Sequence, residues 1–209
     1  MPMRAKKMYD YADKVLALLL KQFIELFDSL KVSFFVDELN VIENVNFLYE
    51  ELDELSQMWL TNIATKAYKD AGGEESSFIT RQWLTENVLE EYDKVTKYVY
   101  TNEVDRKRSR LAESLIASDN KSNEIDRALK LWSAMISQYA ITAVDTASLA
   151  AYKSLGVKEV VWKNIKDGKQ CKVCAERDGK VYTIDEAPPK PHIGCRCYLV
   201  PKGRKSNGK

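Results

Sequence analysis

The sequence predicts a mainly α protein, in which an elongated helical N-terminal region leads into a small α+β module at the C-terminal end. Three observations support this prediction. No proline occurs between Pro2 and Pro188, and because a proline inside a helix costs about 3 kcal/mol, this stretch can form long helices. Apolar residues recur there at intervals of three and four, the spacing of one helix face. All four cysteines and the only histidine lie between Cys171 and Cys197.

Residues 1–122 are expected to form the helical region. Its first segment carries a wide apolar stripe on Val15, Leu19, Phe23 and Phe27. Its second carries another stripe on Leu48, Leu52, Leu55, Trp59 and Ile63. Gly72 and Gly73 should end the second helix, because glycine adopts the backbone conformation that closes a helix.

A third helix is predicted after this break, since one apolar face runs through Leu84, Val88, Tyr92, Val95 and Val99. It leads into the basic run 105–110, which we interpret as a solvated helix face.

Residues 123–156 are expected to form the longest helix. Its stripe begins with Ile125, Leu129 and Trp132 and continues with small alanines, which let another element approach closely. Gly156 should end it in a left-handed conformation. Residues 157–201 then form the small module, with strands predicted at 157–162 and 180–184 because of their valine-rich composition. The tail 202–209 is basic, rich in glycine and expected to be flexible.

The cysteines form two close pairs, Cys171-x2-Cys174 and Cys195-x-Cys197. Thiolate sulfur is a preferred ligand of Zn²⁺, and two pairs can build a closed, structural site of four ligands. The sequence therefore predicts a zinc-knuckle-like module, and a domain of about 45 residues gains folding energy from such an ion. His192 is an alternative ligand in place of Cys195 or Cys197, or a hydrogen-bond partner of a sulfur.

Two other interpretations of the cysteines remain open at this point. Four cysteines allow two disulfides, although the basic start of the chain leads into acidic residues and not into the apolar core of a signal peptide. Redox chemistry at Cys171-x2-Cys174 is less favoured, because no βαβ pattern surrounds the pair.

Charge is unevenly distributed along a chain whose net charge is only +1. Residues 1–100 hold 18 acidic and 11 basic side chains, whereas residues 151–209 hold 6 acidic and 14 basic ones. Basic surface is typical of proteins that contact nucleic acid. We assign this role to Arg196, Lys202, Arg204 and Lys205. A solvated lysine-rich surface, or one that docks on an acidic protein, is the alternative.

The overall composition argues against several classes of function. At 45% hydrophobic and 30% charged residues, the chain is typical of globular proteins. The most apolar run, 15–27, contains Lys21 and Glu25, so no membrane span is expected. A zinc-stapled nuclease would need catalytic histidines beyond the single contested His192. A zinc-ribbon DNA-binding protein is the other alternative, although no helix-turn-helix is recognisable.

The C-terminal part also resembles a known family. The residues that carry the resemblance are Trp162, Asp167, Cys171-x2-Cys174, Asp178-Gly179-Lys180-Val181-Tyr182, Pro188-Pro189 and Pro191-His192-Ile193-Gly194-Cys195-Arg196-Cys197. Together they resemble the C-terminal signature of phage head morphogenesis proteins, the Mu F-like minor head family, over residues 125–201. Many members have proline where this chain has Ile193, and the Arg-Thr-Glu-like run of longer members is absent around 139–146.

This resemblance implies a non-enzymatic minor capsid protein, present in few copies, that acts in head morphogenesis at the portal vertex. Implied partners are the portal protein or the inner capsid, which residues 1–122 would contact, and double-stranded DNA. Neither a membrane nor a small-molecule substrate is implied. The expected location is the virion, in the capsid interior or at the portal vertex, after synthesis in the host cytoplasm.

Overall fold

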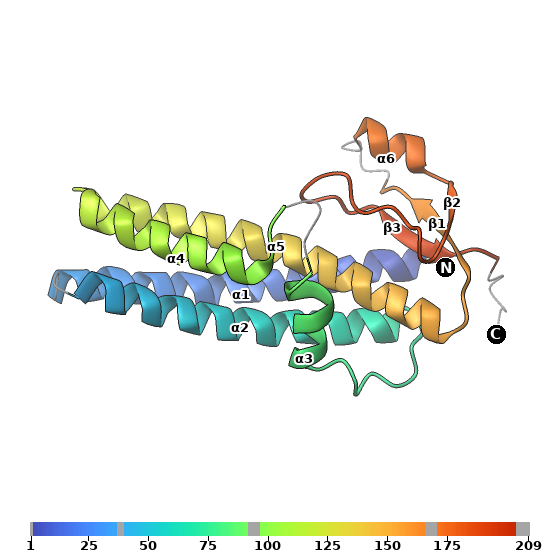
Figure 1. Cartoon of the computed structure of the whole chain (residues 1–209), viewed down its shortest axis with the longest axis horizontal. Helices are drawn as coiled ribbons and strands as arrows, with labels where there is room; N and C mark the ends of the chain where they lie inside the picture. Colours follow the sequence, from blue (N-terminus) through green and yellow to red (C-terminus); the bar gives the residue numbers. More distant parts are fainter. Residues whose placement is uncertain (1, 37–39, 92–96, 166–170, 204–209) are drawn as a thin grey trace.

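The computed structural model describes residues 2–36, 40–91, 97–165 and 171–203. Four long helices lie side by side along the long axis of the molecule, and a small sheet with one short helix lies at one end (Figure 1). The long helices are α1 (Pro2–Val36), α2 (Val41–Asp70), α4 (Tyr100–Ala117) and α5 (Lys121–Ser154). The protein is therefore mainly α, with a cysteine-rich C-terminal module, as the sequence predicts.

All four long helices share one apolar core. Helices α1, α2 and α5 contact one another pairwise, and α4 packs against both α2 and α5. Trp132 of α5 is fully buried, and its ring makes T-shaped contacts with Phe23 from α1 and Tyr49 from α2 at centroid distances of 6.3 and 5.3 Å. Because four helices contribute to this one cluster, the core joins most of the chain.

The apolar stripes expected for the first two helices are confirmed. Val15, Leu19, Phe23 and Phe27 are all buried in α1. In α2, Leu48, Leu52 and Ile63 are buried, and Leu55 and Trp59 pack against the core while remaining partly exposed. Burial of these stripes is what stabilises the helices, since helix propensity alone contributes little.

The third helix was predicted as one unbroken element, and this prediction is wrong. The helix α3 (Arg81–Leu84) continues as the π-helical segment Thr85–Leu89, and α4 begins only at Tyr100. Lys97 has a φ of +64° and Val99 is extended, so neither residue can belong to a helix. Tyr92 and Val95 lie outside the described residues. Leu84 and Val88 are buried and Val99 is half-buried, so the apolar spacing reports burial in successive segments and not one continuous helix.

The helix that was predicted to be the longest, α5, begins and ends close to where the sequence places it, although α1 with 35 residues is slightly longer than α5 with 34. Asn120 caps α5, since its side-chain oxygen accepts the N–H of Asn123 at 3.1 Å. Gly156 follows α5 with a φ of +69°, the left-handed conformation that glycine adopts without strain. From here the backbone turns away from the helices into the sheet.

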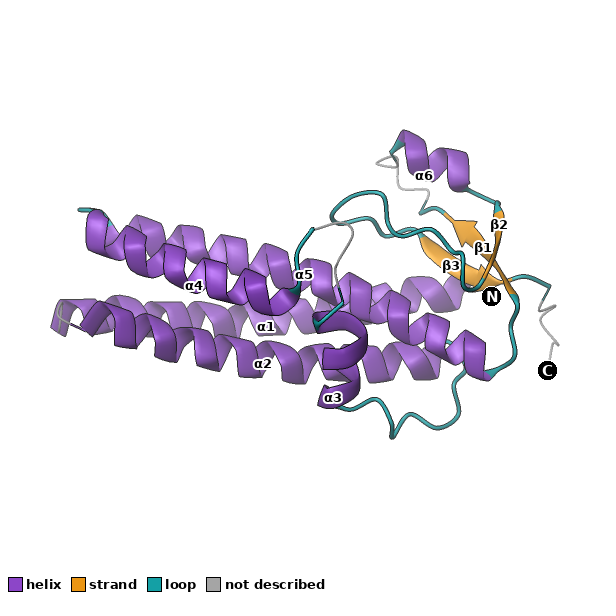
Figure 2. Ribbon diagram, viewed as in Figure 1, coloured by secondary structure: helices purple, strands orange, loops and turns teal. Residues whose placement is uncertain are grey.

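The sheet contains β1 (Glu159–Lys163), β2 (Val181–Thr183) and β3 (Tyr198–Pro201) in the order β2-β1-β3. Both pairings are antiparallel, and Val161 of the central strand lies opposite Val181 and Val200. The short helix α6 (Lys172–Arg177) lies beside this sheet (Figure 2). In the described part of the chain, no helix has an apolar stretch long enough to cross a membrane.

Candidate metal centre

The first pair of cysteines lies at the start of α6. Cys171 is the N-cap of this helix, and its sulfur accepts the backbone N–H of Cys174 at 3.3 Å. One turn of helix therefore presents both sulfurs on the same side. Cys174 is almost fully buried and packs, with Cys195 and Cys197, against Trp162 of β1.

The other donors come from the loop that precedes β3. Gly194, with a φ of +73°, turns the backbone between His192 and Cys195, and the N–H of Cys195 donates to the His192 carbonyl at 3.3 Å. This turn directs the histidine ring and the Cys195 sulfur toward the same place. Cys197 follows, also buried.

The donor atoms form two groups of three that share Cys174. One group is Cys171, Cys174 and His192, and the other is Cys174, Cys195 and Cys197; within each group all donor atoms lie within 4.8 Å of one another. The Cys174 and Cys195 sulfurs are 3.5 Å apart. Sulfurs bound to one tetrahedral zinc ion, with bonds of about 2.3 Å, lie about 3.8 Å apart. These residues can therefore hold a metal ion.

All four cysteines are free thiols. A disulfide would require a sulfur-to-sulfur distance of about 2.05 Å, which the 3.5 Å between Cys174 and Cys195 exceeds. The separation fits ligands around an ion better than a covalent bridge.

His192 is oriented by its own backbone. Its Nδ1 lies 2.9 Å from the Ile193 carbonyl oxygen, and its Nε2 lies 4.0 Å from the Cys174 sulfur. An Nδ1–H that donates to this carbonyl leaves the Nε2 lone pair directed at the cysteines. Histidines that bind metals commonly donate their other ring N–H in this way, so the geometry is suitable for a histidine ligand.

Burial and hydrogen bonds raise the pKa of some of these thiols and lower that of others. Burial raises the pKa of Cys174 to about 12, and hydrogen bonding to Cys197 together with burial raises the pKa of Cys195. The pKa of Cys171 is lowered, chiefly because its sulfur accepts the Cys174 N–H. At neutral pH a metal ion must therefore displace protons from the thiols of Cys174 and Cys195 when it binds.

Two buried clusters lie in the module; the one that joins Val160 and Ile184 to Tyr152 of α5 is apolar, and the other consists largely of these ligand candidates. Its buried members are Trp162, Cys174, Cys195 and Cys197, and the Trp162 indole N–H has no hydrogen-bond partner among the described atoms. Cysteine buries little apolar area compared with leucine or phenylalanine. A core built from sulfur is therefore weak unless a cation joins the sulfurs.

Polar contacts attach the module to α1 and α5. The Gly194 N–H donates to Gln138 of α5 at 3.0 Å. Lys190 reaches the Tyr9 hydroxyl at 3.0 Å and the Asp145 carboxylate at 3.1 Å, and Tyr9 also donates to Asp145. The module is thus seated against these two helices.

The proposed nucleic-acid-binding residues lie in different surroundings. Arg196 forms a two-pronged ion pair with Asp13 of α1, and Lys202 pairs with Glu159 at 2.9 Å. Arg204 and Lys205 lie outside the described residues. In the basic run 105–110, Arg106 pairs with Glu103 and Arg108 with Asp105. Carboxylates of the chain itself therefore offset much of the positive charge.

Sequence reasoning missed the residues that seat the module. Tyr9, Gln138, Asp145 and Lys190 are polar residues without a motif, and Tyr9 and Lys190 are 181 residues apart in the chain. The only signal was the alanine-rich second half of α5, which predicts the close approach of another element. Which side chains meet there depends on the folded arrangement.

The family model described as phage Mu protein F like protein matches residues 90–200, more than half of the chain. The chain therefore belongs to the phage Mu F-like family, a family of phage head proteins. The match includes α4, α5 and the module, and begins well before residue 125, where the resemblance in the sequence starts. Comparisons with curated proteins and with solved structures found no match.

Proposed function

We propose that this protein is a non-enzymatic minor head protein that acts in head morphogenesis at the portal vertex, with its C-terminal module held by one structural zinc ion. The observation that carries the proposal is the convergence of cysteine and histidine donors on Cys174, in a chain of a phage head family. The ion would supply the cross-link that a sulfur-lined core lacks.

Cys171, Cys174, Cys195 and Cys197 are the proposed zinc ligands, with His192 as the alternative to one of the last two. Cys174 belongs to both donor groups, so an ion bound there can take donors from α6 and from the loop before β3. Four ligands leave no open position for a substrate, which supports a structural site and not a catalytic one. A His192→Ala variant that keeps its zinc would assign the site to the four cysteines.

The long helices are proposed to dock on the portal protein or the inner capsid, with the module directed toward packaged DNA. The acidic first 100 residues and the basic last 59 support this polarity. Arg196 and Lys202 remain partly exposed despite their ion pairs, so with Arg204 and Lys205 they can still approach phosphates. Contacts of this kind should weaken steeply as salt concentration rises.

Two measurements test the proposed function. The first detects the protein in purified phage heads and in complexes with the portal protein, with and without nuclease treatment. The second measures DNA binding across salt concentrations for the intact chain and for an Arg204→Ala/Lys205→Ala variant. Absence from heads and failure to bind portal protein under either condition would contradict the head role. Salt-independent DNA binding would contradict the proposed phosphate contacts.

A further inference from the structure

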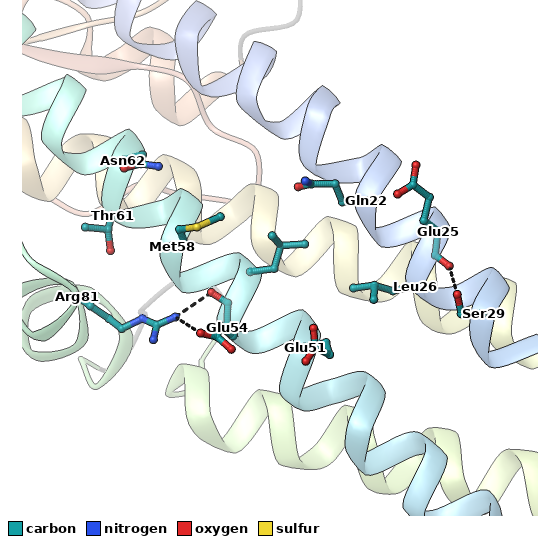
Figure 3. A pocket seen from close by; sticks show the side chains of 11 residues that line it. Gln22, Glu25, Leu26, Ser29, Glu51, Glu54, Met58, Thr61, Asn62 and Arg81 are labelled. Atoms are coloured by element: carbon teal, nitrogen blue, oxygen red, sulfur yellow. Dashed lines mark hydrogen bonds and ion pairs between the residues drawn. The ribbon is translucent and has the colours of Figure 1, made fainter. Parts of the chain in front are cut away.

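An open groove runs along the outer face between α1 and α2. Gln22, Glu25, Leu26 and Ser29 of α1 form one wall, and residues of α2 from Glu51 to Asn62 form the other. Figure 3 shows Leu26 and Met58 on the two walls, with Arg81 at one side bonded to Glu54. The Trp59 indole donates to Gln22 at 3.1 Å and so joins the walls below the surface.

Other elements cover parts of the other two grooves of the α1–α2–α5 core. Helix α4 packs against both α2 and α5. The module contacts one end of α1 through Tyr9 and Asp13, and α5 through Gln138 and Asp145. In the described part of the chain, the α1–α2 groove is lined only by residues 22–29 and 51–62 and by Arg81 of α3 at its edge, so no element covers it. An open groove between two core helices has the geometry that a further helix fills.

Exposed apolar side chains continue both walls of the groove, at steps of three or four residues that keep them on the same helix face. On α1, Leu18 precedes Gln22 by four positions and Val32 follows Ser29 by three, and these side chains are 54% and 63% exposed. On α2, Phe47 precedes Glu51 by four positions and is 65% exposed, and Met58 is 46% exposed. The α2 stripe from Phe47 to Asn62 spans about 22 Å at 1.5 Å per residue.

This length argues for an elongated ligand. The groove itself has a volume of about 730 Å³, which would suit a small molecule. A compact molecule would nevertheless leave Leu18, Val32 and Phe47 uncovered. A helix of four or so turns would cover the groove together with these exposed side chains, and exposed apolar side chains beside a groove are typical of interaction sites.

The negative charge of the groove indicates which kind of helix it can bind. Glu25, Glu51 and Glu54 line it, and Arg81, the one cation among its described lining residues, is engaged by Glu54 through the carbonyl at 2.9 Å and the carboxylate at 4.0 Å. Glu25 and Glu51 have no ion-pair partner among the described residues. A ligand that matches this surface presents an apolar stripe flanked by lysine or arginine.

We propose that the α1–α2 groove docks an amphipathic helix with basic flanks from another protein of the phage head. The inference rests on the proposed function for the identity of that protein, whereas the apolar and acidic character of the groove defines the chemistry of its helix. It places the docking surface on the part of the chain that precedes the family match.

The test uses two synthetic helical peptides as probes, both with the same leucine stripe, one flanked by lysines and the other by glutamates. We expect the full-length protein to bind the lysine peptide at least about tenfold more tightly than the glutamate peptide, measured by fluorescence anisotropy. Met58→Glu should weaken binding of the lysine peptide by at least about tenfold. Glu25→Lys/Glu51→Lys should reverse the preference between the peptides.

Ile116→Glu is the matched control, because Ile116 of α4 is as exposed as Phe47 but lies outside the groove; it should leave binding unchanged. Equal affinity for the two peptides, no binding, or insensitivity to Met58→Glu would overturn the proposal. So would a dimer of the free chain that Met58→Glu dissociates, since a second copy would then be the occupant. Absence of the protein from phage heads, with peptide binding intact, would contradict the proposed function and leave the chemistry of the groove standing.

Discussion

Lys190 is one of the residues through which the module contacts the helical body. Its ammonium group contacts the Tyr9 hydroxyl and the Asp145 carboxylate and lies 5.3 Å from the Tyr9 ring centroid and 5.8 Å from that of Trp162. Its side chain is only 11% exposed. Burial raises the pKa of Asp145, and the charge of Lys190 opposes that rise. The contact therefore depends on a cation that is largely shielded from water.

Lys190→Met should destabilise the protein by about 1–3 kcal/mol, because it leaves Asp145 and the Tyr9 hydroxyl without their buried partner. Denaturant unfolding followed by circular dichroism measures the change. Lys202→Met is the matched control: both partners of the Lys202–Glu159 pair are about half exposed, so its loss should cost less than about 1 kcal/mol. Equal losses in the two variants would show that the Lys190 contact contributes no more than a surface ion pair.

The ligand candidates could be found in the sequence because cysteine and histidine are rare in this chain and their spacing is typical of metal sites. The sequence could not show that Cys174 is common to both donor groups, because the two cysteine pairs look equivalent along the chain. That distinction depends on the Cys171 N-cap, which turns both sulfurs toward the loop at Gly194.

Helix α5 is the element to which the rest of the fold is attached. It packs against α1, α2, α4 and β3, and its Trp132 fills the centre of the core. The sequence predicted this helix because its apolar spacing is long and uninterrupted. The neighbouring region 84–99 misled the same reasoning, because Val99, which is half-buried and lies outside the helices, continues the helical spacing of the buried Leu84 and Val88. Periodicity records which side chains are buried, and Lys97 and Val99 show that the backbone between them can leave the helix.

Trp132→Ala should cost about 3–5 kcal/mol, because it removes a fully buried ring on which three helices pack. Leu131→Ala, one position away on the exposed side of α5, should change stability by less than about 0.5 kcal/mol. Thermal or urea unfolding of the two variants measures this difference. A cost for Trp132→Ala as small as that of its neighbour would contradict the central role of α5.

Buried tyrosines make the stability of the whole protein depend on pH in the alkaline range. Burial raises the pKa of Tyr49 and Tyr100 above the usual value, and that of Tyr152 to about 12. Because the folded state holds these protons more tightly than the unfolded chain, stability is fully present below about pH 10 and falls as pH rises through the folded pKa values.

Titration of tyrosinate absorbance together with circular dichroism should therefore show these residues ionising only as helicity is lost. These three tyrosines should stay protonated until the helices unfold. Complete ionisation of every tyrosine near pH 10 with helicity retained would contradict the burial described here.

The overall architecture was predictable because the composition changes along the chain. The absence of proline and the helical periodicity indicated a helical body, and the cysteine cluster indicated a small module. The seating of the module on α1 and α5 was not predictable, because Asp13 and Arg196 are ordinary surface residues until folding brings them together across 183 positions. The same pair explains why the basic end of the chain carries less free charge than its sequence suggests.

We propose that one zinc ion, bound around Cys174, holds the module together, and elemental analysis of the purified protein is the decisive measurement. We expect one zinc ion per chain in the wild type and in Val173→Ser, an exposed neighbour, and none in Cys174→Ser, where the module should unfold while most helicity remains. A wild-type protein without zinc, or a Cys174→Ser variant that retains it, would rule out this role of the ion.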